Sequence, residues 1–193
     1  MRKIIIIGSG GHASSCIDVI EQEKKFKIVG LIDNKKKVGT KVLKYKVIGS
    51  DKDLEIIKKK VKNVCIGIGQ LSLQNTRSII FKRLKILGFN LPSIISPRSH
   101  ISKYSKIGEG SIVHHGVIIN AGAEIGNNCI INSMSLIEHN TRIQDNCHIS
   151  TSVTINGDVV IGGNSIIGSK AVIRNSINLK KNSFVKMGEI IKK

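Results

Sequence analysis

Two histidines stand nine residues apart in the stretch NSMSLIEHNTRIQDNCHIS, residues 132–150. A neutral imidazole can take a proton from an attacking hydroxyl or amine, because its unperturbed pKa of about 6.5 lies close to physiological pH. Such a base can act on the attacking group directly, without a covalent nucleophile. None of the serines stands in a GxSxG turn. His139 and His148 are therefore the first candidates for chemistry.

A six-residue repeat surrounds both histidines. Every sixth residue is a branched aliphatic: Ile95, Ile101, Ile107, Val113, Ile119, Ile125, Ile131, Ile137, Ile143, Ile149, Ile155, Ile161, Ile167, Ile173, Leu179, Val185 and Ile191. A helix has a period of 3.6 residues and cannot keep such a stripe on one face. The fourth residue after each stripe position is mostly small. Short strands joined by tight corners explain both patterns, and three sides close a coil of eighteen residues.

A second repeat, of eighteen residues, supports this coil. Asn128, Asn146, Asn164 and Asn182 each end a turn triplet, and asparagine tolerates the left-handed backbone of a tight corner. Cys129 and Cys147 follow two of these asparagines and are expected to stack inside the coil. The four cysteines form no CxxC pair and no zinc spacing, so we interpret them as reduced packing residues. Residues 91–193 are predicted to form a parallel β-solenoid.

Residues 1–90 show a different pattern, in which strands alternate with helices. KIIIIG, FKIVGLIDN and NVCIGIGQ are typical of buried strands, and DKDLEIIKKK is typical of a helix. A long helix is expected over SLQNTRSIIFKRLKILGF, with an apolar face made of Leu73, Ile79, Ile80, Leu84 and Leu87. This alternation predicts a small Rossmann-like α/β domain with a parallel sheet.

The turn GSGGHA follows the first predicted strand and is close to the dinucleotide fingerprint GxGxxG/A. Asp33 ends the second strand, 22 residues after Gly11, near where a ribose-binding acid is expected. Three interpretations of this turn are open. It binds NAD, it binds a nucleotide-linked or otherwise acidic sugar, or it is only a tight turn without a ligand. About 90 residues cover only half of a dinucleotide fold, which disfavours NAD. His12 is either a contact to an acidic ligand or a surface residue.

The formal charge of +18 indicates a surface that attracts anions. The lysines are scattered and aromatic residues are only 3% of the chain, so a nucleic-acid binder is disfavoured. A nucleotide or coenzyme A remains a suitable polyanionic ligand. The sequence has no run of eighteen apolar residues and no signal-peptide core, and we interpret the protein as cytoplasmic, without a membrane span.

The two halves together resemble the sugar acetyltransferases of the sialic-acid O-acetyltransferase type, which are close relatives of the bacterial UDP-4-amino-sugar N-acetyltransferases. The most specific stretch is INSMSLIEHNTRIQDNCHISTSVTINGDVVIG. The resemblance implies a left-handed parallel β-helix, a homotrimer, acetyl-CoA as co-substrate and no metal. It implies that His139 is the catalytic base and that His148 lies near the acetyl group of the coenzyme. It also implies that Gly157 and Ser169 line the coenzyme A groove. It assigns acceptor binding to Gly10, Gly11, His12, Asp33, Asn34 and Gly69.

Two features depart from the family pattern. N-acetyltransferases often carry a glutamate directly after the catalytic histidine, where this chain has Asn140. Asparagine can orient the ring but brings no charge, which favours the O-acetyl branch. The usual C-terminal G-x-P-A loop over coenzyme A is replaced by FVKMGEIIKK.

The spacing of the two histidines has a geometric consequence. Nine residues are half of a coil, so His139 and His148 should lie on different sides of the prism. His148 precedes the inward Ile149 and should face outward, and His114 and His115 are expected on the surface. We therefore hypothesise an active site between protomers. His139 of one chain activates the acceptor, and His148 of the other donates a hydrogen bond to the acetyl carbonyl.

The sequence thus predicts an acetyl-CoA-dependent sugar acetyltransferase of bacterial surface-glycan biosynthesis that O-acetylates a sialic-acid-like sugar. The alternative is an N-acetyltransferase acting on a UDP-linked 4-amino sugar, and a remote alternative is a non-catalytic solenoid scaffold. A carbonic-anhydrase-like metal solenoid needs three converging histidines, and the histidine spacing does not favour it.

Overall fold

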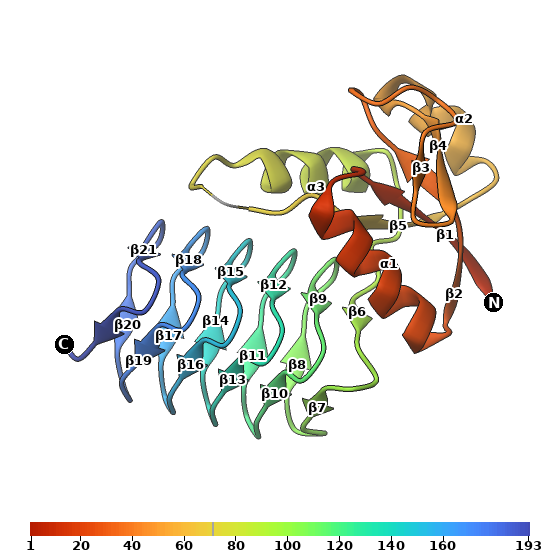
Figure 1. Ribbon diagram of the computed structural model, residues 1–193. Coiled ribbons are helices and arrows are strands. Elements are labelled where there is room, and N and C mark those ends of the chain that lie inside the picture. Colours follow the sequence, from red (N-terminus) through yellow and green to blue (C-terminus); the bar gives the residue numbers. More distant parts are fainter. Residues whose placement is uncertain (71) are drawn as a thin grey trace.

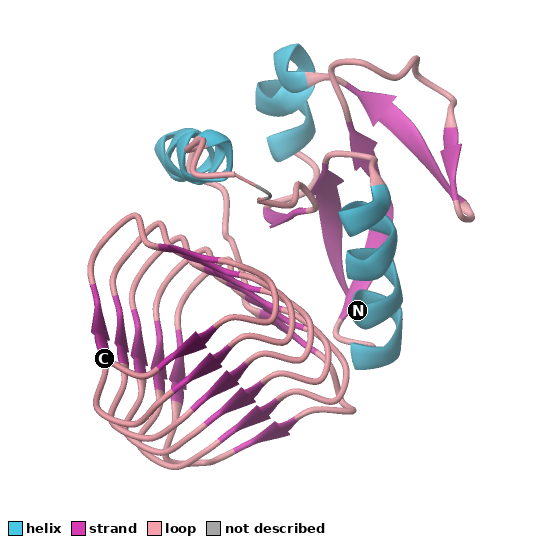
Figure 2. Ribbon diagram, turned by 60° about the vertical axis from the view of Figure 1, so that its left-hand side comes forward, coloured by secondary structure: helices cyan, strands magenta, loops and turns pink. Residues whose placement is uncertain are grey.

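The computed structural model describes residues 1–70 and 72–193. Figure 1 shows an α/β lobe at the N-terminal end and a prism of short strands that continues to the C-terminus. Figure 2 looks more nearly along the prism and shows its three-sided cross-section.

The α/β lobe is built on a sheet of strand order β3-β4-β2-β1-β5. Its elements are β1 (Arg2–Ile7), α1 (Gly11–Glu23), β2 (Phe26–Ile32), β3 (Lys41–Val42), β4 (Tyr45–Gly49), the 3-10 helix η1 (Asp51–Asp53), α2 (Leu54–Lys58), β5 (Asn63–Ile66) and α3 (Thr76–Ile86). Ile4 and Ile6 of β1 pack with α1, whereas Ile5 and Ile7 pack with residues of α2 and α3. Both faces are covered, so an uninterrupted apolar strand is stable here. The predicted parallel α/β domain is confirmed.

The helix expected over residues 72–89 differs from the prediction. It begins at Thr76, so Leu73 precedes it, and Ile79 is 64% exposed. The inner face of α3 carries Arg77 and Leu84 in place of the predicted Leu73 and Ile79. The apolar pattern was misleading because the inward position at the start of this helix is occupied by an arginine. The β3–β4 hairpin was not expected either.

The prism consists of two-residue strands, and each ends at a residue of the aliphatic stripe. They are β6 (Ile94–Ile95), β7 (His100–Ile101), β8 (Lys106–Ile107), β9 (Ile112–Val113), β10 (Ile118–Ile119), β11 (Glu124–Ile125), β12 (Ile130–Ile131), β13 (Leu136–Ile137), β14 (Arg142–Ile143), β15 (His148–Ile149), β16 (Thr154–Ile155), β17 (Val160–Ile161), β18 (Ile166–Ile167), β19 (Val172–Ile173), β20 (Asn178–Leu179), β21 (Phe184–Val185) and β22 (Ile190–Ile191). The stripe fills the interior together with Cys129 and Cys147, as predicted. The domain boundary between residues 90 and 91 stays a prediction, since Leu91 still packs in the core of the α/β lobe.

The corners of the prism have left-handed backbone at every sixth residue. The residues with positive φ are Gly110, Gly116, Gly122, Asn128, Met134, Asn140, Asn146, Ser152, Asp158, Asn164, Lys170, Ser176, Asn182 and Gly188. Asn128 also donates from Nδ2 to Oδ1 of Asn146 in the next coil, at 2.8 Å. The predicted asparagine corners are confirmed, and the same geometry extends to residue types that tolerate it less well.

The outer surfaces of the three sheets differ, because the first residue of each strand points outward. We call the sheet β21-β18-β15-β12-β9-β6 the covered face, because its Ile94, Ile112 and Ile130 pack against α1. The sheet β20-β17-β14-β11-β8 is the charged face, where Glu124 pairs with Lys106 at 3.1 Å. The sheet β22-β19-β16-β13-β10-β7 is the apolar face, and its outward residues include Ile118, Leu136, Val172 and Ile190.

Two histidines lie where the α/β lobe meets the covered face, His12 partly buried and His114 buried. His12 of α1 and His114 stack edge to face, with ring centroids 5.5 Å apart. His114 is only 2% exposed, so its predicted surface location was wrong: α1 covers it. Burial and the nearby Arg77 lower the pKa of His12 to about 3, and burial and the neighbouring His115 lower that of His114 to about 4. Both rings are therefore neutral at pH 7.

No helix within residues 1–70 and 72–193 is both long enough and apolar enough to cross a membrane.

The exposed corner residue Lys170 gives a test of backbone strain. Its φ is 60°, a conformation that disfavours any side chain with a Cβ. We expect Lys170→Gly to raise the free energy of unfolding by about 0.5–1 kcal/mol, the relief of strain exceeding the added freedom of the unfolded chain. Lys170→Ala keeps the Cβ and should leave stability nearly unchanged. Urea unfolding of the two variants checks this, and equal stabilities would contradict it.

The buried histidines predict that acid destabilises the lobe interface. Their native pKa values lie below the value of about 6.5 expected in the unfolded chain, so unfolding takes up protons below that pH. Stability should be complete above pH 6.5 and fall by about 1.4 kcal/mol per pH unit for each histidine, down to about pH 4. Unfolding free energies at pH 7 and pH 5 measure this slope.

A matched pair of variants isolates the cause. His114→Gln removes one titrating ring and should make the fall with pH shallower. The outer residue of β7 is exposed, so His100→Gln should leave the slope as in the parent protein. Equal slopes in all three proteins would show that the buried histidines do not control acid stability.

Candidate functional site

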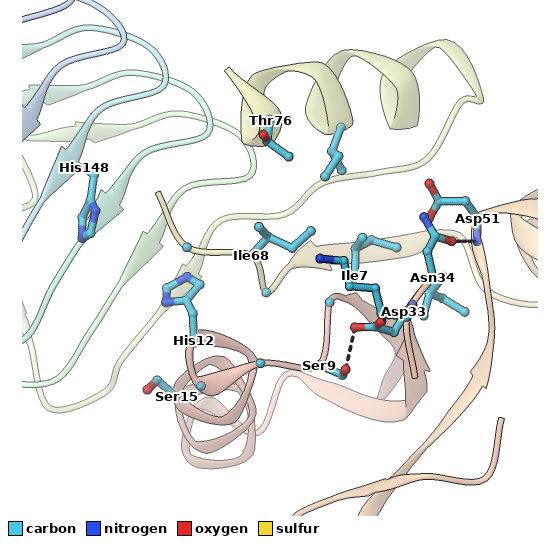
Figure 3. A pocket seen from close by; sticks show the side chains of 18 of the residues that line it. Ile7, Ser9, His12, Ser15, Asp33, Asn34, Asp51, Ile68, Thr76 and His148 are labelled. Atoms are coloured by element: carbon cyan, nitrogen blue, oxygen red, sulfur yellow. Dashed lines mark hydrogen bonds between the residues drawn. The ribbon is translucent and has the colours of Figure 1, made fainter. Parts of the chain in front are cut away.

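A pocket of about 840 Å³ opens at the carboxyl edge of the α/β sheet and continues to the covered face of the prism. Figure 3 shows its lining side chains, from Asp33, Asn34 and Asp51 at one end to His148 at the other. In parallel α/β sheets, ligands bind at this edge, where the ends of the strands leave a crevice. The pocket therefore has the position of a ligand site, and it spans both lobes.

The glycine turn between β1 and α1 forms one wall of this pocket. Gly8 has a φ of +94°, and a Cβ there would lie 2.6 Å from Cγ1 of Ile68, so only glycine fits. Gly10 and Gly11 have open space where a Cβ would stand, and no described side chain caps the N-terminus of α1. The first backbone N–H groups of α1 thus have room to bind an anion, which the helix dipole favours.

Asp33 braces the glycine turn. Its Oδ2 accepts a hydrogen bond from Ser9 Oγ at 2.5 Å, and its Oδ1 accepts from the backbone N–H groups of Lys35 and Lys36 at 2.8 and 3.1 Å. Partial burial opposes ionisation, but these hydrogen bonds and the Lys36 ammonium hold the pKa of Asp33 below its usual range. The neighbouring Asn34 accepts from the backbone N–H of Asp51 at 3.0 Å. The predicted acceptor-binding residues Asp33 and Asn34 line the pocket, with Asp33 already engaged by the protein.

His148 closes the opposite end of the pocket. It points out of the prism as predicted, but it is only 6% exposed because the loop after β5 covers it. Its Nδ1 lies 2.5 Å from the backbone oxygen of Gln70, and its Nε2 lies 3.5 Å from Nδ2 of Asn132. Gly69, in the same loop, lies against His12. A Cβ added at Gly69 would be 3.6 Å from the Cβ of His12. The structure thus brings together His148 and the residues predicted to bind the acceptor.

His139 lies elsewhere, beside a corner between the apolar and the charged faces. Its side chain is exposed and rests on Gly157, where a Cβ would lie 2.5 Å from the ring. Nδ2 of Asn140 lies 3.4 Å from Nδ1 of His139 and 3.2 Å from Oδ1 of Asp158. The predicted residues His139, Asn140 and Gly157 therefore form a second group, away from the pocket.

Ser169 belongs to neither group. It precedes the corner residue Lys170, and its carbonyl accepts the N–H of Gly188 at 2.8 Å. The predicted site residues thus fall into the pocket, the His139 corner and the Ser169 corner. Among the described residues, no group of His, Cys, Asp or Glu side chains could hold a metal ion.

Sequence reasoning missed Gln70, Arg77, Asn132 and Thr76. Arg77 is buried and donates to the carbonyls of Ile66 and Ile68, which fixes the loop that carries Gln70. No sequence motif marks these residues as part of a site. The eighteen-residue period could have placed Asn132 near His148, since Ile130 pairs with His148 in the next coil.

Comparisons with known proteins agree with this architecture. The PglD N-terminal domain matches residues 3–84, and the bacterial transferase hexapeptide repeat matches residues 104–139 and 140–175. No curated protein sequence gives a significant match. A structure of perosamine N-acetyltransferase from Caulobacter crescentus with CoA and GDP-perosamine is 25% identical in sequence and has a TM-score of 0.93. The match covers 100% of this chain and 90% of that one. In a related structure of that enzyme, one histidine is replaced by asparagine.

A second match concerns the fold alone. The acetyltransferase domain of PglB from Neisseria gonorrhoeae with acetyl coenzyme A is 24% identical and has a TM-score of 0.88, over 98% of this chain and 92% of that one. The chain thus joins a PglD-type N-terminal domain over residues 3–84 to hexapeptide repeats over residues 104–175. This is the architecture of the sugar acetyltransferases among its structural matches, and it supports a relation of this chain to the hexapeptide-repeat sugar acetyltransferases.

Proposed function

We propose that this protein transfers the acetyl group of acetyl-CoA to the amino group of a nucleotide-linked sugar. The observation that carries the proposal is the continuous pocket from Asp33 and Asn34, past the glycine turn, to His148 on the prism. A ligand that fills it needs a polar nucleoside end, an anionic middle and a sugar-sized end.

The middle of the pocket suits a pyrophosphate. The open N-terminus of α1 offers backbone N–H groups beside Gly10 and Gly11. His12, neutral at pH 7, can contribute a hydrogen bond there but no charge. The nucleoside then lies toward Asp33 and Asn34, and the sugar lies toward Asn132 and His148. The overall charge of +18 favours the approach of such an anion.

The comparison with perosamine N-acetyltransferase supports both substrates of the proposed reaction. That enzyme is described with CoA and with a nucleotide-linked amino sugar, GDP-perosamine. For this chain the family resemblance implies that coenzyme A contacts Gly157 and Ser169. These residues lie at different corners of one prism, so in the proposed assembly they belong to neighbouring chains. Acetyl transfer then proceeds by direct attack on the thioester, helped by one imidazole that takes a proton and one that holds the carbonyl oxygen.

The apolar face supports a homotrimer with an active site between chains. Isoleucine, leucine and valine side chains point outward there, and Ile118 and Ile190 are 41% and 58% exposed. Burying such a patch favours association with a second copy. His139 lies at the edge of this face, outside its own chain's pocket. In the proposed assembly, His139 of one chain completes the pocket of the next.

O-acetylation of a sialic-acid-like sugar is the second candidate. It rests on Asn140, which replaces the glutamate that often follows the catalytic histidine in N-acetyltransferases. The nucleotide-sized pocket favours the nucleotide-linked acceptor over a free nine-carbon sugar.

An acceptor assay separates these candidates. The full chain is incubated with acetyl-CoA and either GDP-perosamine, a UDP-linked 4-amino sugar or free N-acetylneuraminic acid, and thiol release is followed. We expect release with an amino sugar and a loss of about 10²–10⁴-fold in His139→Ala, because one imidazole is missing at the reacting centre. Lys59→Ala, an exposed residue outside the pocket and the apolar face, serves as the control and should match the parent. Release with N-acetylneuraminic acid alone would favour O-acetylation, and no release with any acceptor would reject the function.

Mixing two inactive variants tests the shared site. His139→Ala and His148→Ala chains each lack one imidazole at every site of their own homotrimers. Mixed trimers contain intact sites, so random exchange should restore about a quarter of the parent activity if neighbouring chains build the site. Activity that stays at the level of the separate variants after verified subunit exchange would contradict the interchain site.

A further inference from the structure

The nucleoside end of the pocket has an apolar wall. Ile7 and Ile32 are the last residues of β1 and β2, and they line the pocket together with Ile68 and Ile80. A flat heterocycle can bury its faces against such side chains, whereas a charged phosphate gains nothing from them. The base of a nucleotide therefore suits this part of the pocket, and the polar groups at its end can contact the edge of the base.

Asn34 provides a hydrogen-bond donor at this end. Its Oδ1 accepts from the backbone N–H of Asp51 at 3.0 Å. A backbone N–H only donates, so this contact identifies the oxygen of the amide and leaves the two N–H groups of Nδ2 for another partner. No described residue accepts a hydrogen bond from them. Figure 3 shows Asn34 and Asp51 next to each other at the end of the pocket.

Asp51 places a hydrogen-bond acceptor beside this donor. Its Oδ2 accepts from Arg83 at 2.7 Å, and the second guanidinium nitrogen of Arg83 lies 3.4 Å from the backbone oxygen of Asp51. These contacts hold the carboxylate in place, while its Oδ1 has no hydrogen-bond partner among the described residues. A carboxylate oxygen accepts more than one hydrogen bond, so both oxygens of Asp51 can still accept from a ligand.

An amide donor next to a carboxylate matches the edge of guanine better than that of any other base. Guanine carries O6, the N1–H group and the N2 amino group along one edge. Its O6 can accept from Nδ2 of Asn34 while N1 and N2 donate in parallel to the carboxylate of Asp51. Uracil has a single N–H between two carbonyl oxygens, so one of these must face the carboxylate, which disfavours its binding. Adenine and cytosine offer an amino group there but no second N–H.

We propose that Asn34 and Asp51 select a guanine base, so that the acceptor is a GDP-linked amino sugar and not a UDP-linked one. This rests on the proposed function, in which the nucleoside occupies this end of the pocket. Both residues lie at the opposite end from His148, so they act on the affinity for the nucleotide and not on the chemical step.

Calorimetry with nucleoside diphosphates tests the choice of base without acetyl-CoA and without turnover. We expect the full chain to bind GDP about 10–100-fold more tightly than UDP, the discrimination typical of a bidentate contact to a base. Inosine diphosphate is the matched ligand, because it differs from GDP only by the missing amino group. It should bind about 10-fold more weakly than GDP, since one of the two N–H groups is absent. UDP binding as tight as that of GDP, or equal affinities for GDP and inosine diphosphate, would overturn the proposal.

Two variants separate the carboxylate from its ion pair. Asp51→Asn cannot accept two N–H groups in parallel, so the Kd of GDP should rise about 10–100-fold while that of UDP stays near the parent value. Arg83→Gln removes the ion pair but keeps the carboxylate, and it should retain the preference for GDP. An equal loss of preference in both variants would contradict a direct contact of Asp51 with the base.

Melting temperatures of the variants are compared with the parent. If Asp51→Asn is unfolded, Asn34→Asp replaces it. This variant can still accept from the backbone N–H of Asp51, but it sets a carboxylate against O6 and should weaken the binding of GDP. Unchanged GDP affinity in a folded Asn34→Asp chain would count against the proposal.

Turnover distinguishes the base from the reaction. With acetyl-CoA, kcat/KM should be about 10–100-fold higher for a GDP-linked than for a UDP-linked 4-amino sugar, with the difference in KM. Preferred binding of GDP without acetylation of either sugar would reject the acetyltransferase and leave the choice of base standing. Equal or faster acetylation of the UDP-linked sugar would overturn the choice of base and leave the proposed function standing. A chain that binds none of the nucleoside diphosphates would overturn both.

Discussion

The buried guanidinium group of Arg77 connects the two lobes, and the pocket depends on it. It donates to the carbonyls of Ile66 and Ile68 in the α/β lobe and of Gly110 and Asn128 at corners of the prism. A guanidinium remains charged at any physiological pH, so its burial is tolerable only if its N–H groups are satisfied. None of the ion pairs among the described residues involves Arg77. Backbone dipoles thus replace a counter-ion, and they fix the relative position of the lobes.

The regular parts of the fold were predictable because they are local and repeated. An isoleucine every six residues and an asparagine every eighteen specify the coil, since one coil stacks on the next with the same register. A single inward Ile149 therefore predicts the direction of His148 correctly. The glycine turn was predictable for a similar reason, because a tight βα turn with Gly8 at a φ of +94° requires glycine. The strand β2, which ends just before Asp33, was predictable from its apolar run.

The environment of the histidines was not predictable from those patterns. His114 and His148 point out of the prism, which correctly suggests solvent for an isolated solenoid. The α/β lobe covers both, and nothing in the local sequence reveals where that lobe docks. Arg77 shows the same difficulty, because nothing in the sequence around it indicates that its hydrogen-bond partners include carbonyls far along the chain, at Gly110 and Asn128. Long-range packing thus determines whether these histidines are buried, and burial lowers their pKa values.

The docking of the α/β lobe on the prism therefore also affects the protonation of His148. The same lobe contact that buries His148 supplies the Gln70 carbonyl that fixes its tautomer. His139, at an exposed corner, depends instead on Asn140, its neighbour in sequence. A substitution at position 140 can therefore exchange donor and acceptor at the corner without disturbing the pocket. The hydrogen-bond partner of each ring thus favours one tautomer, through the lobe contact at His148 and through a neighbour in sequence at His139.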